Sequence, residues 1–301
     1  MIQYLPHNKI DKSLWDSCLQ NSPNGVIYGT SWYLDQLSPG WEALILDDYR
    51  AVMPLPVKQK WGIPYLIRPA FCQQLGVFAY SSIDNALIEE FIGNIPSKFK
   101  WINMPLNEGN NIENLPISKE SGINYLLSLA PTYDSLRAGF VQNTKRNRAK
   151  AAEKKIIAEY SEDISALVNL KLQHAFSSLN QSHMKFLNNI FERSKPSGDA
   201  KIICVMDEDE KMMAGALFIL FRNRWIYLLS TSSSKGKENR AMFAVIDKFI
   251  HDHAGSEEFL DFEGSMIPEL ARFFAGFGAL PLYYPILKSN HLPFPLNIIK
   301  K

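Results

Sequence analysis

The chain has 301 residues, of which 46% are hydrophobic and 21% are charged. This is the composition of a globular protein long enough for two domains. The formal net charge is +1, so no global field favours DNA or an anionic membrane, and any polyanion site has to be local. No run of about 18 apolar residues predicts a membrane span, and nothing at the N-terminus predicts a secretory signal. We therefore expect a cytoplasmic protein.

The three cysteines, Cys18, Cys72 and Cys204, are far apart, and no CxxC pair is present. This spacing argues against a zinc ribbon and against a disulfide framework. We expect buried free thiols in a reducing compartment, and no bound metal.

The first half of the chain mixes helices and strands. Patterning predicts helices at residues 12–20, 31–37 and 83–92, strands at 41–46, 49–58, 63–67, 100–104 and 124–129, and a loop at 103–121. Asp47-Asp48 indicates a turn that pairs the first two strands as a hairpin. Pro54 and Pro56 place the second strand at a sheet edge or a bulge. We place a domain boundary near Ala130-Pro131.

The second half is more regular. A helix is predicted at residues 133–155, with Thr132 or Asp134 near its cap and a strongly basic middle. The elements that follow are a strand at 155–160, helices at 164–177 and 182–194, a meander at 201–207, 212–222 and 225–231, a polar loop at 232–239, a helix at 240–253, a short strand ending in carboxylates, a helix at 267–275 and a last strand.

Asp261 and Glu263 stand two residues apart on the predicted short strand, so their side chains face the same side. Like charges this close raise the pKa of at least one carboxyl group, which makes it a usable general base near neutral pH. Both are therefore catalytic candidates. The alternative is structural: one carboxylate caps the next helix or pairs with Arg272.

Gly264-Ser265 breaks the chain just before the helix at 267–275. Close backbone approach and exposed N–H groups at a helix start suit a carboxylate, a phosphate or an oxyanion, so both residues are candidates for substrate binding. The alternative makes Ser265 a plain N-cap residue.

Tyr283 and Tyr284 are neighbours on the last strand, so they alternate faces and one of them leaves the core. A tyrosine hydroxyl can protonate a leaving group or hold a tetrahedral intermediate, which makes both catalytic candidates. The alternative is a pair of packed aromatic rings.

Two stretches carry local positive charge. The polar loop offers Gly236 for close backbone approach to a phosphate, with Lys235, Lys237 and Arg240 as counter-charges. The alternative is a solvated loop.

The densest basic run lies in the helix at 133–155. Arg146, Lys150 and Lys154 share one helix face at i, i+4 spacing, whereas Lys145 falls elsewhere. Lys145 and Arg146 are candidates for contact with CoA phosphates or a tRNA backbone. The alternative is a solvated helix face.

No HExxH, GxSxG, P-loop or GxGxxG pattern is present, so hydrolase, kinase and dinucleotide-binding functions lose their usual support. The element order of the second half is that of the GNAT acyltransferase fold. Three stretches resemble the Fem-type peptidyltransferase and "acetyltransferase 6" branch of that superfamily. They are residues 261–265 (DFEGS) with 272–279 (RFFAGFGA), similar to DF-x-G…K/R-x-x-FG-A; the basic helix at 144–152; and the strand at 51–56 (AVMPLP).

The resemblance implies an α/β fold with mixed sheets and tandem GNAT-like lobes. A degenerate N-terminal lobe would span residues 1–130, and a C-terminal lobe at 131–301 would carry the active site. The implied activity is transfer of an acyl or aminoacyl group to a small-molecule or peptide-like amine. Acyl-CoA, or aminoacyl-tRNA, would be the co-substrate, and no cofactor would be permanently bound. The alternative is a non-catalytic ligand-binding protein of the same fold.

The resemblance also implies roles for residues. Glu263 or Asp261 would accept the amine proton, and Tyr283 or Tyr284 would donate to the leaving group. Where many relatives carry a lysine, this chain has Phe274, and Arg272 is the nearby cation. In the loop before the helix at 240–253, Glu238 replaces a small residue. The second lobe has no room for a helical arm of the tRNA-dependent cell-wall enzymes, which favours an acyl-CoA donor.

Overall fold

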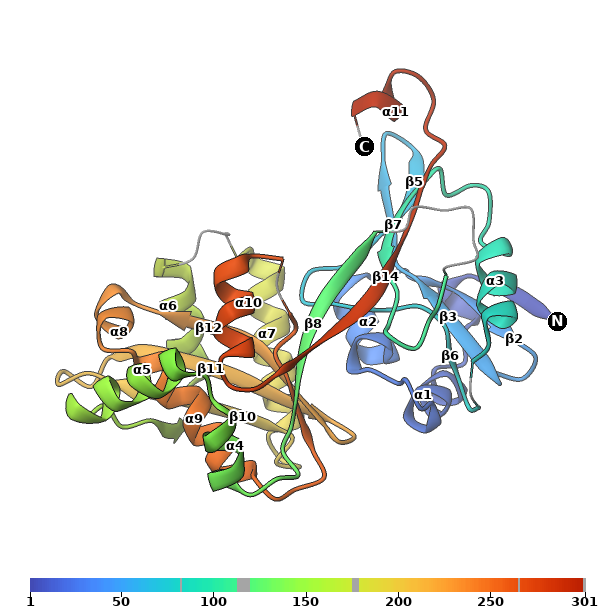
Figure 1. Cartoon of the computed structure of the whole chain (residues 1–301). Helices are drawn as coiled ribbons and strands as arrows, with labels where there is room; N and C mark the ends of the chain where they lie inside the picture. The colour runs from blue at the N-terminus through green and yellow to red at the C-terminus, as the bar shows by residue number, and fades with distance from the viewer. Residues whose placement is uncertain (82, 113–119, 175–178, 265, 300–301) are drawn as a thin grey trace. The chain divides into compact units, whose positions relative to one another are not determined.

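A computed structural model of the chain describes residues 1–81, 83–112, 120–174, 179–264 and 266–299 (Figure 1). Its contacts divide the chain into two units. Unit 1 comprises Met1–Ile123 and Tyr283–Lys301, and unit 2 comprises Asn124–Leu282. The sequence placed a boundary near residue 130 and assigned everything after it to one lobe. In the structure, the end of the last strand and the residues after it are grouped with unit 1 instead.

Unit 1 contains two sets of strands. An antiparallel sheet runs in the order β1 (Ile2–Leu5), β2 (Glu42–Leu46), β3 (Ala51–Leu55) and β6 (Phe78–Ala79), and a second ladder runs in the order β4 (Val57–Lys60), β5 (Ile63–Ile67), β7 (Trp101–Pro105) and β14 (Leu280–Asn290). The helices are α1 (Lys12–Asn21), α2 (Ser31–Leu37), α3 (Asn85–Gly93) and α11 (Leu296–Ile299), with 3-10 turns at His7–Lys9 and Ile27–Gly29.

The predicted hairpin of unit 1 is confirmed, since β2 and β3 pair antiparallel with Leu46 opposite Ala51. The strand predicted at 49–58 is divided, however. Pro56 lies between β3 and β4, and the two strands belong to different ladders. Proline has no N–H group to donate, so a strand that changes its partner at this point loses no ladder bond there.

Unit 2 is a mixed sheet with helices on both faces. The strand order is β8 (Ser121–Ser128), β13 (Phe259–Asp261), β12 (Arg224–Ser232), β11 (Met212–Phe221), β10 (Ala200–Met206) and β9 (Glu159–Ser161). The helices are α4 (Tyr133–Gly139), α5 (Gln142–Glu153), α6 (Ile164–His174), α7 (Gln181–Ser194), α8 (Ser234–Glu238), α9 (Ala241–His253) and α10 (Pro268–Ala275). Figure 1 shows α6 and α7 on one face of the sheet, and α9 with α4 and α5 on the other.

Aromatic packing holds α9 to the sheet. Phe249 stacks on Phe218 of β11 with ring centroids 4.1 Å apart, and His253 stacks on Phe249 at 4.3 Å. The predicted meander is confirmed, because β10, β11 and β12 pair antiparallel in sequence order. The strand β13 then returns parallel to β12, with α9 in the connection.

The helix predicted at 133–155 is two helices, because the chain is extended at Phe140 and Val141. The Phe140 ring is buried and meets Phe277 edge-on at 5.2 Å, and the Val141 N–H donates to Gly276 O at 3.0 Å. Burial of this ring and a satisfied backbone donor outweigh the helical preference of the local sequence. Thr132 is the N-cap of α4, as expected.

The polar loop predicted at 232–239 contains the short helix α8. Ser233 caps it by accepting from the Gly236 N–H at 3.1 Å, and donates from its own hydroxyl to Met213 O at 3.1 Å. Gly236 is buried against β11 so closely that a Cβ atom there would lie 2.2 Å from Met213 O. The glycine is therefore a packing requirement.

All three cysteines are free and buried, as the sequence predicts. Burial raises the pKa of the Cys18 thiol to about 12. Over the residues that the structure covers, no helix combines the length and the apolar character needed to cross a bilayer.

We expect Gly236→Ala to destabilise the protein by about 1–3 kcal/mol, since the added methyl group meets a backbone oxygen that cannot move without distorting β11. Gly139→Ala is the matched control in unit 2, because its new Cβ has open space around it. Urea unfolding followed by circular dichroism gives both midpoints. Equal midpoints for the two variants would contradict this account of α8.

Candidate functional site

The most open part of the unit 2 sheet is the place where two parallel strands separate. β13 pairs with β12 only as far as Ile226 opposite Asp261, and β13 ends there, whereas β12 continues to Ser232. Among the described strands, none pairs with residues 227–232 on the β13 side. Unpaired N–H and C=O groups along a strand edge can bind an extended, amide-bearing chain.

A β-bulge explains the separation. In the ladder between β11 and β12, Leu217 lies opposite Leu229 while Phe218 lies opposite Tyr227, which leaves Leu228 as an extra residue. A bulge bends its strand and increases the local twist. Because it follows directly after Ile226, it turns β12 away from β13 at the last residue that the two strands share.

Asp261 is the last residue of β13 that pairs with β12. Its side chain is 2% exposed and its Oδ2 accepts from Asn124 Nδ2 at 3.0 Å and Arg224 Nη1 at 3.3 Å. Its Oδ1 accepts from the Glu263 backbone N–H at 2.8 Å. A buried carboxylate needs such compensation, and the same bonds fix the backbone of Glu263. Asp261 therefore contacts Arg224 and not Arg272, the partner considered from the sequence.

The prediction that Asp261 and Glu263 lie on one strand face is wrong. β13 ends at Asp261, and Glu263 and Gly264 take the left-handed conformation with φ of 56° and 57°. This backbone reverses the chain direction that a strand would keep. Glu263 is half-buried, and Ser265 lies outside the described residues.

The helix after this break has a different start from the one expected. Ile267 is the N-cap of α10 and Pro268 its first residue, so the cap is not Ser265. Arg272 is exposed and pairs with Glu269 on the same helix at 3.1 Å. Phe274 is buried and stacks on Phe262 at 4.9 Å, so an aromatic cluster occupies this side of α10.

Tyr283 and Tyr284 belong to unit 1, whereas Asp261 and Glu263 belong to unit 2. The predicted alternation is confirmed, since Tyr283 is 63% exposed and Tyr284 is 7% exposed. Tyr284 packs on Gly122, where a Cβ atom would lie 2.2 Å from the ring. Both tyrosines line a polar pocket of about 500 Å³ within unit 1, together with Glu108, Asn110, Asn111, Ile112, Glu120, Ser121 and Pro285.

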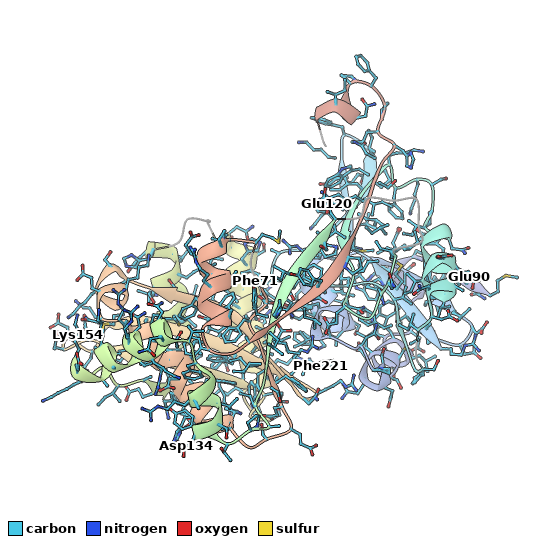
Figure 2. The ribbon with its side chains drawn as sticks, viewed as in Figure 1. Phe71, Glu90, Glu120, Asp134, Lys154 and Phe221 are labelled. Carbon is cyan, nitrogen blue, oxygen red and sulfur yellow. The ribbon has the colours of Figure 1, made fainter. Side chains whose placement is uncertain are left out.

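Buried amides hold one wall of this pocket in place. Gln74 Oε1 accepts from the Glu108 N–H at 3.1 Å, and the Asn110 side chain accepts from Val77 N at 2.7 Å and donates to Val77 O at 3.0 Å. Satisfied buried polar groups make a rigid wall. One carboxylate oxygen of Glu108 is shielded from solvent, and Glu120, labelled in Figure 2, bonds Lys288 at 2.5 Å. Because Glu120 is paired with Lys288, Glu108 is the carboxylate that makes the pocket suited to a cationic group.

Two of the three cations of the predicted phosphate loop around α8 are engaged within the fold, whereas Lys237 is exposed. Lys235 pairs with Glu208 at 2.6 Å and with Asp207 at 3.6 Å. Arg240 donates from Nη1 to Lys237 O at 3.3 Å. Because Gly236 packs against β11, its missing side chain allows close approach to the backbone of Met213 and not to a phosphate.

The basic residues that lie close together around α5 differ from those expected from the sequence. Arg146 is exposed and contacts Asn143 at 3.4 Å, and Lys154 (Figure 2) donates to Asn239 Oδ1 at 2.9 Å. Lys145 lines a hollow of about 420 Å³ together with Asp134, Arg137, Ala138, Arg148, Ala149 and Ala152. Sequence reasoning missed Arg137 because it lies on α4, which was taken as one helix with α5.

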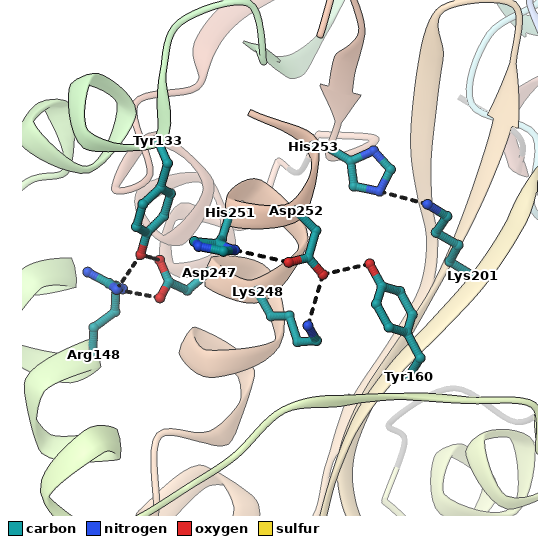
Figure 3. A network of polar contacts seen from close by, with 9 residues as sticks. All are labelled: Tyr133, Arg148, Tyr160, Lys201, Asp247, Lys248, His251, Asp252 and His253. Atoms are coloured by element: carbon teal, nitrogen blue, oxygen red, sulfur yellow. Dashed lines mark hydrogen bonds and ion pairs between the residues drawn. The ribbon is translucent and has the colours of Figure 1, made fainter. Parts of the chain in front are cut away.

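A polar network joins α9 to its neighbours (Figure 3). Arg148 of α5 forms an ion pair with Asp247, and its Nη2 donates to the Tyr133 hydroxyl at 2.8 Å. Burial and the nearby Asp247 raise the pKa of Tyr133 to about 12. Asp252 lies further along α9. Burial alone would raise its pKa, but hydrogen bonds from His251, Lys248 and Tyr160 outweigh burial and lower the pKa to about 2.

His253 is held neutral by its two partners. Lys201 Nζ can only donate and lies 3.1 Å from Nε2, whereas the Glu258 carboxylate can only accept and lies 3.1 Å from Nδ1. Both contacts are satisfied by the tautomer with hydrogen on Nδ1. Burial lowers the pKa of His253, in part offset by Glu258.

Lys171 was missed by the sequence analysis because it stands alone in an ordinary amphipathic helix. Its Nζ donates to Ser230 O at 3.0 Å, on the part of β12 that continues beyond β13. Burial lowers the pKa of this amine. Across the described ranges no carboxylate pairs with it. A desolvated ammonium without a counter-ion gains most from a ligand that carries negative charge.

Comparison with known proteins supports the fold. Neither a protein-family model nor a curated protein matches the chain. Among solved structures it resembles FemX at 13% identity, with 99% of both chains covered and a TM-score of 0.66. It also resembles the C-terminal domain of an Agrobacterium fabrum protein described as a lysylphosphatidylglycerol synthetase, at 9% identity, 96% and 94% coverage and a TM-score of 0.56. L-PGS from Bacillus licheniformis matches at 11% identity, 96% and 95% coverage and a TM-score of 0.51.

These similarities show the fold. The chain shares the fold of FemX over nearly its whole length. The predicted fold class, α/β with mixed sheets and GNAT-like lobes, is confirmed.

We expect the stability of the protein to depend on His253 in mild acid. Because its pKa is lower in the folded state than the unfolded value of about 6.5, the unfolded state binds more protons, so stability is complete above that pH and falls as pH drops through it. Urea midpoints at about pH 7.5 and about pH 5.5 measure the fall. His253→Gln should reduce it, whereas the exposed control His174→Gln should not. A wild-type slope in His253→Gln would refute the assignment.

Proposed function

We propose that the protein transfers an acyl or aminoacyl group from an activated thioester or ester to an amine. The observation that carries the proposal is the separation of β12 from β13 after Ile226 and Asp261, on a fold shared with FemX. The similarity to a protein described as a lysylphosphatidylglycerol synthetase fits the same class, since that name denotes joining a lysyl group to a lipid. Acyl-CoA is the donor that we propose first, and aminoacyl-tRNA the second.

The donor chain would lie along the open edge of β12. Its amide groups would pair with backbone N–H and C=O groups of residues 227–232, as an added strand would. Lys171, beside Ser230, would place its ammonium group where the carbonyl oxygen of the acyl group becomes negative. Arg137 and Lys145 are the proposed contacts for donor phosphates, because they line one hollow in which Arg148 is already paired with Asp247.

The reaction then needs two bond changes and two proton transfers. The amine nitrogen attacks the acyl carbon, the new C–N bond forms, and the C–S or C–O bond to the leaving group breaks. The nitrogen loses a proton, which Glu263 would accept directly or through water. The leaving group takes up a proton, which water would supply. Asp261, held by three hydrogen bonds, would position Glu263.

The acidic pocket of unit 1 is proposed to bind an amine. Glu108 supplies the negative charge, since Glu120 is already paired with Lys288, and Tyr283 supplies an aromatic wall. A primary ammonium group on a small molecule or a peptide fits this chemistry. The cytoplasmic location stays a prediction from the sequence.

A donor panel tests the proposed activity. Acetyl-CoA, a long-chain acyl-CoA and aminoacyl-tRNA are each added to the full chain, and thermal unfolding and mass spectrometry of an amine mixture are followed. A donor at about 100 times its Kd raises stability by about 2.7 kcal/mol, which is a readily measured rise in Tm. Binding without acylated product would favour the non-catalytic alternative. No shift with any donor would remove the proposal.

We expect Lys171→Met to lower the transfer rate by about 10²-fold, because it removes one charge that stabilises the oxyanion. Lys185→Met, an exposed lysine of α7, is the control and should leave the rate unchanged. Steady-state kinetics with the donor found above give kcat and KM, and circular dichroism checks folding. A loss confined to KM would place Lys171 in binding only.

We expect Glu108→Gln to weaken binding of a primary amine to unit 1 about tenfold, since a charge-assisted contact becomes neutral. Calorimetry with a short peptide amide that has a free N-terminus measures the affinity. The N-acetylated peptide and the exposed control Glu90→Gln isolate the charge effect. Equal affinity of both peptides for the wild type would contradict an amine site.

A further inference from the structure

One end of unit 1 combines exposed apolar side chains with unpaired cations. We call it the hairpin end, and it comprises residues 58–68 of the β4–β5 hairpin, Lys100, Trp101 and residues 291–298. Figure 1 shows α11 beside the tip of this hairpin. A small apolar hollow of about 110 Å³ lies here, lined by Lys60, Trp61, Ile63, Tyr65, Trp101, Leu292 and Leu296.

Large apolar side chains stand in solvent around that hollow. Trp61 at the hairpin tip is 74% exposed, Phe294 is 78% exposed and Ile298 is 59% exposed. Lys60 Nζ lies 4.6 Å from the centroid of the Trp61 ring. Single exposed apolar residues are ordinary, but a group of them around one apolar hollow marks an interaction surface.

The charge of the hairpin end has one sign. Residues 58–68, 96–107 and 286–299 contain no aspartate or glutamate. Lys58, Lys60, Arg68 and Lys100 are exposed, and none of them pairs with a carboxylate in the part of the chain that the structure describes. Elsewhere in unit 1 the pattern differs, since Lys98 pairs with Glu42 and Lys288 with Glu120.

This combination selects among possible partners. A second copy docked on the same end would bring like charges together, which opposes association. A nucleic acid would use the cations and the indole ring, but it gains nothing from an exposed isoleucine. The surface of a membrane uses all three features, because indole rings favour the headgroup region, apolar side chains enter the acyl boundary and basic residues attract anionic lipids.

We propose that the hairpin end binds the surface of a membrane containing anionic lipid. Trp61, Phe294 and Ile298 enter the interface, and Lys58, Lys60, Arg68 and Lys100 face the headgroups. The binding is peripheral and reversible, and it does not depend on the transfer reaction proposed above. It would place unit 1 at a surface where lipid-linked molecules are found.

Vesicle sedimentation with the full chain tests the proposal. We expect the protein to sediment with vesicles of phosphatidylglycerol and phosphatidylcholine, to bind at least about tenfold more weakly to phosphatidylcholine alone, and to be released by salt. The double variant Lys58→Gln/Lys60→Gln should lose about tenfold or more in affinity. Lys9→Gln/Lys185→Gln is the charge-matched control and should bind as the wild type does.

Serine variants of the exposed apolar residues test how much these side chains contribute to vesicle binding. Trp61→Ser/Phe294→Ser should weaken vesicle binding at least about tenfold, because two rings no longer leave water. The control Ile157→Ser/Leu280→Ser removes two comparably exposed apolar side chains elsewhere and should have no effect. Circular dichroism and thermal unfolding confirm that each variant is folded.

Trp61 also reports on its own environment. Trp15, Trp41, Trp101 and Trp225 are buried, Trp32 is half-buried and Trp61 is 74% exposed. The part of the blue shift and of the acrylamide protection that Trp61→Phe removes is therefore assigned to Trp61. Trp61→Phe should keep most of the binding and lose most of the blue shift. No sedimentation, or sedimentation that the hairpin-end variants leave unchanged, would overturn the proposal. So would dimerisation or RNA binding that depends on Trp61 while vesicle binding does not.

Discussion

The buried carboxylate of Asp261 is the constraint on which the candidate site in unit 2 depends. At 2% exposure it has to be compensated, and Asn124, Arg224 and the Glu263 N–H do this from three different parts of the chain. These bonds tie the end of β13 to β8 and β12 at the point where the bulge at Leu228 turns β12 away. The left-handed turn at Glu263 follows, and residues 227–232 of β12 have no partner on the β13 side among the described strands.

Packing against distant residues decided several local structures. Phe140 interrupts a helix because its ring is buried against Phe277, and within the short helix α8 only a residue without Cβ fits at Gly236 against Met213 O. Phe274 is buried because it completes a stack with Phe262. Each case exchanges a local preference, or a polar contact, for buried apolar contact, which is the larger energy in a core.

The contacts that each cation makes in the folded chain determine whether it can bind a ligand. Lys235 is paired with Glu208 and Arg240 with a backbone carbonyl, so two cations of the loop that looked most suited to phosphate are engaged within the fold. Lys171 differs from Lys235 because it is desolvated and no carboxylate pairs with it among the described residues. Charge in the sequence therefore predicts a binding site only when the folded chain leaves that charge uncompensated.

The sequence by itself determined the element order, the α/β class, the hairpin of β2 and β3, the meander of β10 to β12 and the alternation of Tyr283 and Tyr284, because each rests on a local period or a turn signal. It also predicted Asp261, Glu263 and Lys145 as candidate functional residues. Only the tertiary structure decided that Asp261 is an anchor, that Lys171 lies beside an open strand edge and that Arg137 and Arg148 join Lys145. Those outcomes depend on burial and on partners far away in the chain, which no local pattern encodes.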